Sequence, residues 1–339
     1  MSEPSLFQWK TLYELARQYQ DAAPWQWMYD HEIFGVQESG TGDTCYCSVI
    51  GRMGEVFGLV VYPGSEGLLS YYRLLAAENT VDHEVALEQR ALSLIFASRD
   101  ELTTRDWSII KDLGLKFRGK NAWPLFRSSL PGTHPWYLTG EEAELFGVVL
   151  EQALHFCLEF RDNPAFQDPP DEDYIPVRVW GKEGWRSEWR TLPPPPDIEI
   201  PVFIPTDTMV QRLKQQCRKS TAIWETSFFF TPVPVYEGKK DERPYYPLVV
   251  LWVDRGSTQI LHFQMFPRGE WEKVVESLLS ASIQTRILPA EIHTAQEEMF
   301  GLLLPAAEKL GIKLKRTRRL TAFQRAKDGL LQDMSGRFF

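Results

Sequence analysis

One order of expected elements occurs twice along the chain, and this repetition limits the folds that the chain can adopt. A helix, three short strands and a second helix are predicted in residues 4–77, and the same order is predicted from Thr206 to Leu279. In both halves a short strand and a helix come next, and these helices end at Gly114 and Gly311. The sequence therefore predicts an α+β protein with two related α-β-β-β-α-β-α lobes, each a mostly antiparallel sheet with packed helices.

Short sequence matches between the halves favour an internal duplication. The offset between matched positions changes by only a few residues, so small differences in loop length would account for it. The matched positions are Trp25 with Trp224, Pro63 with Pro267, Leu74 and Leu75 with Leu278 and Leu279, and Lys111–Lys116 with Glu308–Lys313.

An acidic, proline-bearing stretch separates the halves. Residues 163–176 hold four acidic side chains, and the run Pro193–Pro196 must be extended. Between them a hairpin is predicted from Val177–Trp180 and Trp185–Thr191. The expected domains are an N-terminal α+β domain over 1–162, a linker with this hairpin over 163–200, and a C-terminal α+β domain over 201–339.

Charge and cysteine content indicate the compartment and limit the partners. The net charge is −9 over 339 residues, which is opposite in sign to that of a general nucleic-acid binder. Four unevenly spaced cysteines argue against a disulfide framework. Met1–Pro4 lacks the features of a signal peptide, and no apolar run reaches the about 18 residues that suggest a membrane span. We therefore expect a cytoplasmic protein that does not bind membranes.

Two segments of the N-terminal half resemble an uncharacterised N-terminal domain of bacterial hypothetical proteins. They are Trp27–Val36 and the sequence from Phe117 to Arg127, which continues through Pro131–Trp136. The stretch Pro289–Leu320 resembles a second uncharacterised domain that follows the first. Together these resemblances cover most of the chain. They imply a bacterial cytosolic protein, and they bring no known activity.

Residues 117–138 contain the candidate binding site. The segment shows no helical or strand period, and it is longer than most irregular loops of compact domains. Cations and amides beside aromatic surface can hold an anion or a peptide carboxylate. The alternative is a compact loop whose aromatic side chains cover the sheet and whose cations face water. The candidate binding residues are Arg118, Lys120, Asn121, Trp123, Arg127, His134 and Trp136.

Two groups of potential metal ligands do not have the spacing of a metal site. Asp30, His31 and Glu32 are adjacent, and a strand would place His31 on the face opposite to its neighbours. Cys45 and Cys47 have no second cysteine pair to complete a zinc site, so buried thiols are expected. The sequence has no nucleotide-binding loop or hydrolase motif. We expect no metal and no cofactor, and the sequence assigns no catalytic residue.

Tryptophans and basic residues suggest two further surfaces. Trp180, Trp185 and Trp189 of the predicted hairpin could stack on bases or sugars, although a hairpin that holds two domains together needs the same side chains. Lys313–Lys327 holds seven basic residues and no acidic one, and could contact nucleic acid or an acidic partner. Its apolar positions, with Leu320 among them, favour instead an amphipathic segment with a solvated face.

The leading functional hypothesis is a non-catalytic binding protein that recognises a peptide or an anionic ligand. Aromatic content, repetition and the lack of reactive clusters motivate it. One alternative is a hydrolase or transferase whose site lies between the lobes and uses His134 or His31 with nearby carboxylates. Another is a weak nucleic-acid binder that uses the basic C-terminal segment. The partner is unknown; a protein or a small anionic ligand fits, and the net charge disfavours nucleic acid.

Overall fold

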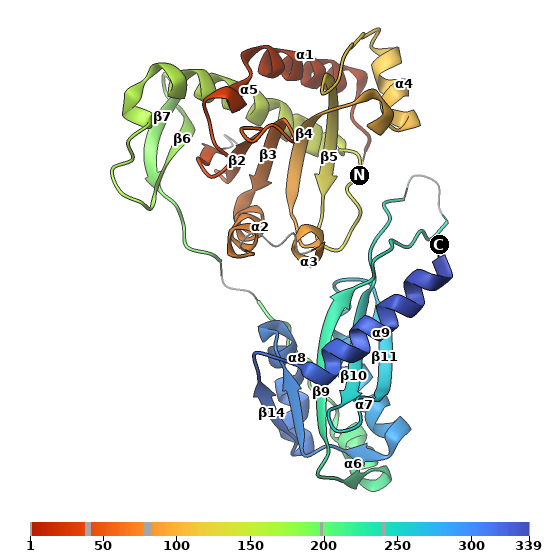
Figure 1. The fold of residues 1–339 in the computed structure, drawn as a ribbon. Coiled ribbons are helices and arrows are strands. Elements are labelled where there is room, and N and C mark those ends of the chain that lie inside the picture. Colours follow the sequence, from red (N-terminus) through yellow and green to blue (C-terminus); the bar gives the residue numbers. More distant parts are fainter. Residues whose placement is uncertain (1, 38–41, 78–82, 197–198, 239–241, 339) are drawn as a thin grey trace. The chain divides into compact units, whose positions relative to one another are not determined.

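The computed structural model contains two lobes, each a β-sheet with packed helices (Figure 1). The first lobe comprises Met1–Pro131 and Pro135–Pro196, and the second comprises Gly132–His134 and Asp197–Phe339. The predicted α+β class with two sheet-bearing lobes is therefore confirmed. The structure describes residues 2–37, 42–77, 83–196, 199–238 and 242–338.

The sheet of the first lobe has seven strands. They are β1 (Phe34–Gln37), β2 (Thr44–Ile50), β3 (Gly58–Pro63), β4 (Ala91–Ala97), β5 (Trp123–Ser129), β6 (Tyr174–Gly181) and β7 (Gly184–Thr191). Their order is β5-β4-β3-β2-β1-β6-β7, and β1 to β5 form an antiparallel meander. The chain then crosses from β5 to the far side of β1, where β6 pairs in parallel. Such a parallel neighbour needs a long crossover, and here a helix provides it.

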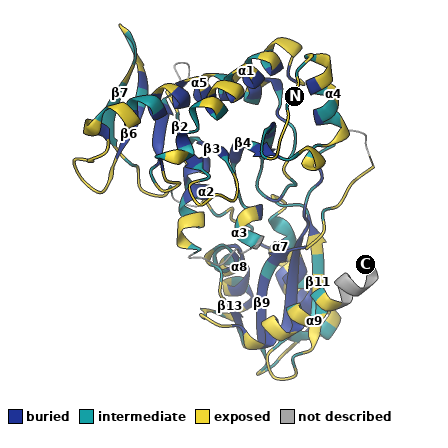
Figure 2. Cartoon of the chain, turned by 45° about the horizontal axis from the view of Figure 1, so that its top comes forward, coloured by how far each residue is buried: buried dark blue, intermediate teal, exposed yellow. Residues whose placement is uncertain are grey.

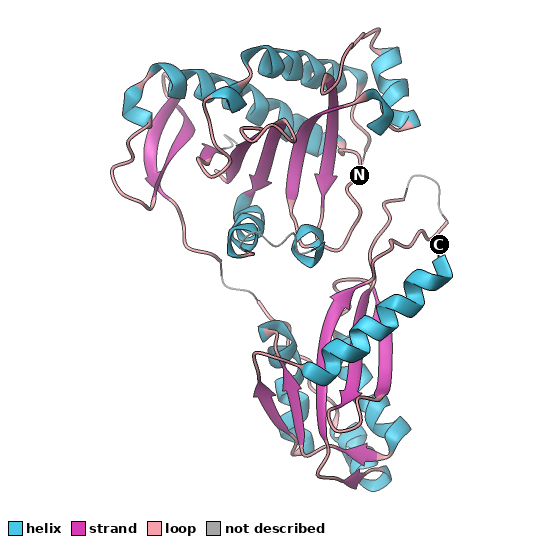
Figure 3. Cartoon of the chain, in the orientation of Figure 1, coloured by secondary structure: helices cyan, strands magenta, loops and turns pink. Residues whose placement is uncertain are grey.

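Helices cover both faces of this sheet (Figure 3). They are α1 (Leu6–Ala22), α2 (Gly64–Ala76), α3 (His83–Leu87), α4 (Thr104–Asp112) and the crossover helix α5 (Gly140–Asp162), with short 3-10 helices at Pro24–Gln26, Arg99–Glu101 and Pro164–Phe166. Helices α1, α4 and α5 each begin with a capping box, formed at Ser5, Thr103 and Thr139. Helix α2 lies so close to β3 that a side chain at Gly67 would collide with the backbone of Tyr62.

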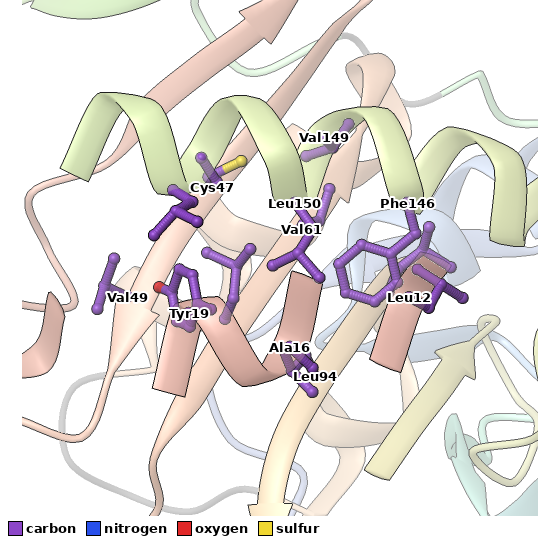
Figure 4. Packing of buried hydrophobic residues seen from close by; sticks show 14 of the residues in the cluster. Leu12, Ala16, Tyr19, Cys47, Val49, Val61, Leu94, Phe146, Val149 and Leu150 are labelled. Carbon is purple, nitrogen blue, oxygen red and sulfur yellow. The ribbon is translucent and has the colours of Figure 1, made fainter. Parts of the chain in front are cut away.

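The main core of the first lobe lies between the sheet and the pair α1 and α5. Figure 4 shows Leu12 of α1, Phe146 of α5 and Val61 of β3 pointing into one apolar cluster. The opposite face packs against α2 through Tyr46 and Tyr62 of the sheet. Alternate strand residues thus face two different apolar layers, so the central strands are buried on both sides (Figure 2).

Two features of the first lobe differ from the sequence-based expectation. The segment 117–138, predicted to be without strand structure, contains β5. Pro124 obscures the strand pattern, yet β5 is an edge strand, where proline is tolerated. The strand predicted from Trp25 begins only at Phe34, because Pro24 opens a 3-10 helix, and Asp30–Glu32 lie outside any strand.

The hairpin predicted inside the linker is formed, but it belongs to the first sheet. Its strands β6 and β7 are the outer two strands beyond β1. Ile175, Val177 and Val179 alternate along β6 and are buried with the α2 side of the sheet. Burial of this apolar row explains why the hairpin adds to the sheet instead of standing between the domains.

The second lobe has a five-stranded sheet and a small two-stranded one. The strands are β8 (Arg218–Lys219), β9 (Ile223–Phe230), β10 (Leu248–Asp254), β11 (Ile260–Phe266), β12 (Ile287–Leu288), β13 (Glu291–Thr294) and β14 (Lys313–Arg316). The larger sheet has the order β11-β10-β9-β13-β14, and β8 pairs with β12. Strands β9 to β11 are antiparallel, whereas β13 and β14 are parallel to their neighbours, so this sheet is mixed.

Four helices accompany the second sheet. They are α6 (Asp207–Gln216), α7 (Glu272–Thr285), α8 (Glu297–Leu310) and α9 (Thr321–Phe338). On one face, Trp252 of β10 donates from its indole N–H to Ser277 of α7 at 2.8 Å. On the other face, Phe229 of β9 and Leu251 of β10 pack against Phe323 of α9. The C-terminal helix is thus the cover of one sheet face (Figure 1).

The two lobes do not share one sheet topology. In the first lobe the fourth strand, β4, joins antiparallel beside β3. In the second lobe the corresponding strand, β13, crosses over and joins parallel beside β9. The matched tryptophans also differ, since Trp25 lies in a 3-10 helix and Trp224 in β9. The element order is similar, but the strand connections do not support an internal duplication.

Truncation of Phe146 to alanine is expected to lower the free energy of unfolding by about 3–5 kcal/mol, because its fully buried ring leaves a cavity between α5 and the sheet. The matched control is Phe7→Ala on α1, where the side chain is 78% exposed and the expected change is within about 0.5 kcal/mol. Urea denaturation of the full chain, followed by circular dichroism, measures both. Equal midpoints for the two variants would contradict the packing in Figure 4.

Candidate functional site

The predicted binding loop begins with an exposed part that consists of two cations and a tight turn. Arg118 and Lys120 are exposed, and neither has a hydrogen-bond or ion-pair partner among the described residues. Asn121 adopts a positive φ of 54°, which asparagine tolerates better than most residues. Its carbonyl accepts a hydrogen bond from the side chain of Gln20 at 3.0 Å, which attaches the turn to α1.

The predicted aromatic residues of the loop have packing roles. Trp123 is buried, and its ring lies 5.2 Å from that of Trp107 and 5.6 Å from that of Phe117. Trp136 exchanges two backbone hydrogen bonds of 2.8 Å with Ser128, which covers part of the outer edge of β5. These contacts match the compact-loop alternative, in which aromatic side chains seal the sheet.

The predicted cation Arg127 is held in an ion pair. Its guanidinium donates two hydrogen bonds to the carboxylate of Asp106, at 2.9 and 2.7 Å. Both side chains are largely buried, with exposures of 15% and 6%. Arg127 and Arg105 also lie over the ring of Tyr137, at 4.9 and 4.1 Å from its centroid. Bidentate pairing of this kind fixes β5 to α4 and leaves Arg127 little capacity for a ligand.

The remaining predicted binding residue, His134, belongs to the second lobe. Its Nδ1 lies 3.2 Å from the hydroxyl of Tyr246, and its backbone N–H donates to the carbonyl of Pro244. The predicted residues therefore do not meet in one site of either lobe. That Arg118 and Lys120 bind a ligand stays a prediction.

The other sequence candidates are also assigned to definite positions. Asp30 and His31 lie in an exposed turn, with Nδ1 of His31 at 3.6 Å from the Asp30 carboxylate. Within the described ranges, no three His, Cys, Asp or Glu side chains are placed to hold a metal ion.

All four cysteines are free and buried, and burial raises the pKa of the Cys47 and Cys157 thiols. Trp189 packs on Phe166, with ring centroids 5.7 Å apart.

The second lobe contains a cluster of buried charged side chains that the sequence did not reveal. We call it the Glu225 cluster, and its members come from β9, the turn after β10, β13 and β14. Two of its side chains are almost fully buried, Glu225 at 3% exposure and His293 at 7%. Buried ionisable groups are unusual unless they are paired, so such a cluster is the strongest functional-site candidate in the lobe. The members are Glu225, Arg255, Glu291, His293 and Lys315.

Glu225 attaches α9 to the sheet. One oxygen of its carboxylate accepts hydrogen bonds from the backbone N–H groups of Ala322 and Phe323, at 2.8 and 3.0 Å. These groups belong to the first turn of α9, where N–H groups lack partners inside the helix. Leu320 precedes the helix and has no acceptor in its side chain, so Glu225 provides the cap from the sheet. The other oxygen lies 3.6 Å from Nε of Arg255.

His293 links the two acids of the cluster. It lies beside Glu225 in the pairing of β13 with β9. Its Nε2 is 2.8 Å from the carboxylate of Glu291, and its Nδ1 is 3.4 Å from Nη1 of Arg255. Because a guanidinium can only donate, Nδ1 must accept and Nε2 must carry the proton that is donated to Glu291. Both ring nitrogens are therefore engaged, and neither is available as a catalytic base in this arrangement.

Glu291 is surrounded by positive charge. Lys315 lies 2.6 Å and Lys313 3.8 Å from its carboxylate. The hydrogen bonds from Lys315 and His293 lower the pKa of Glu291 from 4.5 to about 2. Arg255, Lys315 and the neighbouring Lys313 thus more than balance the charge of the two carboxylates, and these cations are more exposed than the acids: 53% for Arg255 and 38% for Lys315, against 3% for Glu225 and 21% for Glu291.

A row of basic residues continues from the cluster along β14 and into α9. We call it the basic strip. Arg316 pairs with Glu297 at 3.3 Å, but Arg318, Arg319 and Arg325 are exposed and have no acidic partner among the described residues. The basic run in the sequence predicts this surface correctly as a solvated face, because Leu320 and Phe323 are buried beneath it. The strip consists of Lys313, Lys315, Arg316, Arg318, Arg319 and Arg325.

Two family models match the chain. A domain of unknown function (DUF7309) matches residues 9–178, half of the chain, and a domain of unknown function (DUF6930) matches residues 209–331. The chain belongs to the DUF7309 family. The predicted resemblance to two consecutive uncharacterised domains is therefore confirmed, and the DUF6930 part contains both the Glu225 cluster and the basic strip.

The solved structures that match include two integrase catalytic core domains and an intasome, at low similarity. The catalytic core domain of BIV integrase is 13% identical with a TM-score of 0.26, over 34% of this chain and 71% of that chain. The HTLV-2 integrase catalytic core domain in complex with magnesium is 17% identical with a TM-score of 0.27, over 35% of this chain and 72% of that chain. The simian T-cell lymphotropic virus intasome in complex with PP2A regulatory subunit B56 gamma is 16% identical with a TM-score of 0.27, over 37% of this chain and 44% of that chain. At these values the likeness supports no conclusion about activity.

No curated protein matches the chain. In the part of the chain that the structure describes, no helix combines the length and the apolar character of a membrane span.

Replacement of Glu225 by alanine is expected to destabilise the chain by about 1–3 kcal/mol, because two N–H groups of α9 and the Arg255 guanidinium lose their acceptor. The destabilisation would appear as faster amide hydrogen exchange at Ala322 and Phe323 and as a lower midpoint of urea denaturation. The control, Glu297→Ala, removes a 71% exposed partner of Arg316 and should cost at most about 1 kcal/mol. Unchanged exchange at both amides in Glu225→Ala would contradict the capping role.

The stability of the chain is expected to depend on Glu291 between about pH 4.5 and pH 2. The folded pKa of about 2 lies below the ordinary value of 4.5, so the stabilisation is complete above the ordinary value and is lost as the pH falls through the folded one. Glu291→Gln should therefore be less stable than the wild type at pH 6, and the two should converge near pH 2. Urea midpoints across this range measure the difference. A constant difference at every pH would refute the assignment.

Proposed function

We propose that the protein is a non-catalytic binding protein whose second lobe recognises an acidic segment of a partner protein. The observation that carries the proposal is the basic strip, in which Arg318, Arg319 and Arg325 are exposed without acidic partners among the described residues. An exposed cation remains available to an incoming carboxylate, whereas a paired one must first lose its partner. The chain as a whole is acidic, so this local excess of positive charge contrasts with the rest of the sequence.

The Glu225 cluster supports binding more than catalysis. Catalysis by an acid or a base needs a group that can exchange a proton with a substrate. Glu225, His293 and Glu291 instead use their polar atoms on α9, Arg255 and Lys315. The cluster therefore holds Lys313 and Lys315 of the strip in place.

A protein partner is favoured over nucleic acid. A duplex carries dense negative charge, and a chain with a net charge of −9 repels it over distances longer than the strip. A short acidic peptide segment needs contact only with the strip itself.

The triple variant Arg318→Glu, Arg319→Glu, Arg325→Glu is expected to bind fluorescent poly-glutamate at least about tenfold more weakly than the wild type at low salt. Fluorescence anisotropy measures the affinity. The matched control, Arg118→Glu with Lys120→Glu, reverses two unpartnered cations of the first lobe and should leave binding unchanged.

Three results would count against the proposal. Equal affinity of the triple variant and the wild type would exclude the strip. A loss confined to the control variant would move the site to the loop at 117–138. Tighter binding of duplex DNA than of poly-glutamate would favour a nucleic-acid partner instead.

A further inference from the structure

Strand β14 is the last strand of the second sheet, and its outer side has no neighbouring strand in the described chain. Its inner side pairs with β13, where Lys313 donates its N–H to Ala290 at 3.0 Å and Thr317 donates to Thr294 at 2.9 Å. In a parallel ladder, alternate residues bond to the same neighbour. The backbone N–H and C=O groups of the intervening residues, Leu314 and Arg316, therefore point to the open side.

The side chains of β14 alternate between the two faces of the sheet. Lys313 and Lys315 lie on the face with α9, where both approach Glu291. Arg316 lies on the face with α8, where it pairs with Glu297. These three cations share two carboxylates, so an additional strand beside β14 would meet one net positive charge, distributed over both faces and in register with the outward backbone groups.

The other edge strands of the two larger sheets differ from β14 in charge or in backbone access. On β7, Glu188 lies between Arg186 and Arg190 and pairs with both, at 3.0 and 2.7 Å. On β5, Trp136 already bonds to the backbone of Ser128. On β11, the exposed side chains Phe263 and Met265 are apolar. Among the four edges of the two larger sheets, β14 is therefore the one that has basic side chains on both faces and no acidic side chain of its own.

Charged edges commonly prevent pairing with other strands, and the lysines of β14 serve this purpose against apolar or basic segments. The same charges reverse their effect when the incoming strand is acidic, because repulsion becomes attraction. An edge of this kind discriminates by charge while its backbone provides the hydrogen bonds.

We propose that β14 accepts an extended acidic segment of a partner protein as a sixth strand of the second sheet. The backbone of that segment bonds to Leu314 and Arg316, and its acidic side chains meet Lys313 and Lys315 on one face and Arg316 on the other. This inference rests on the proposed function, and it specifies how the acidic partner binds.

The probe is a short capped peptide in which Glu and Val alternate. Its matched partner has the same sequence with every second backbone nitrogen methylated, which keeps the charge and removes the donors of one edge. Two methylated versions, one for each set of alternate residues, cover both registers. We expect the unmodified peptide to bind the full chain, and one methylated version to bind at least about tenfold more weakly than the other.

Two protein variants separate the backbone from the side chain at β14. Leu314→Pro removes an outward N–H and no bond to β13, whereas Leu314→Ala removes the same side chain and keeps the N–H. We expect peptide binding to be lost in the proline variant and kept in the alanine variant, with circular dichroism spectra like that of the wild type for both. If the proline variant is unfolded, the methylated peptides on the wild-type chain still decide the question.

The outcomes distinguish this inference from the proposed function. Equal binding of all peptide versions would overturn the strand addition and leave recognition of an acidic partner in place. No binding of any peptide, together with no binding of poly-glutamate, would overturn both.

Discussion

The organisation of the second lobe depends on the hydrogen bonds that the carboxylate of Glu225 accepts from α9. This carboxylate caps a helix that has no cap of its own, and this fixes the end of α9 over the sheet. From that point α9 covers Phe229, Val249 and Leu251 with its apolar side. The arginines of the helix and of the segment before it are consequently presented outward. One buried acid on a central strand thus determines where positive charge is displayed on the surface.

The buried charged side chains described above are paired, whereas several exposed arginines have no acidic partner among the described residues. The pairs Arg127 with Asp106 and Arg178 with Glu159 join strands to helices in the first lobe. Such buried pairs are costly to break, because the remaining partner would be left without compensation. They hold elements together and are poorly suited to exchanging partners with a ligand. The proposed recognition of an acidic partner therefore rests on cations that the fold leaves exposed to water.

Local sequence patterns predicted individual elements better than they predicted connections. The helix α1, strand β2 and helix α4 follow clear periodicity and capping, and the structure has them in the predicted order along the chain. Helix α5 was missed because it is apolar on several sides, as it contacts both α1 and the sheet. The pairing of β13 with β9 brings His293 beside Glu225, although they are far apart in the sequence. No local sequence pattern predicts such a strand register. The basic run could therefore be recognised in the sequence, whereas its proximity to Glu225 could not.

The distribution of the buried thiols has a practical consequence. Cys45, Cys47 and Cys157 are enclosed in the first lobe, and Cys217 is enclosed in the second. A thiol must reach solvent and ionise before it reacts with an alkylating reagent. Alkylation under native conditions therefore proceeds through opening of the surrounding structure, and the modified cysteine identifies the lobe that opened. The chain carries its own reporters of local unfolding, and no labels need to be introduced.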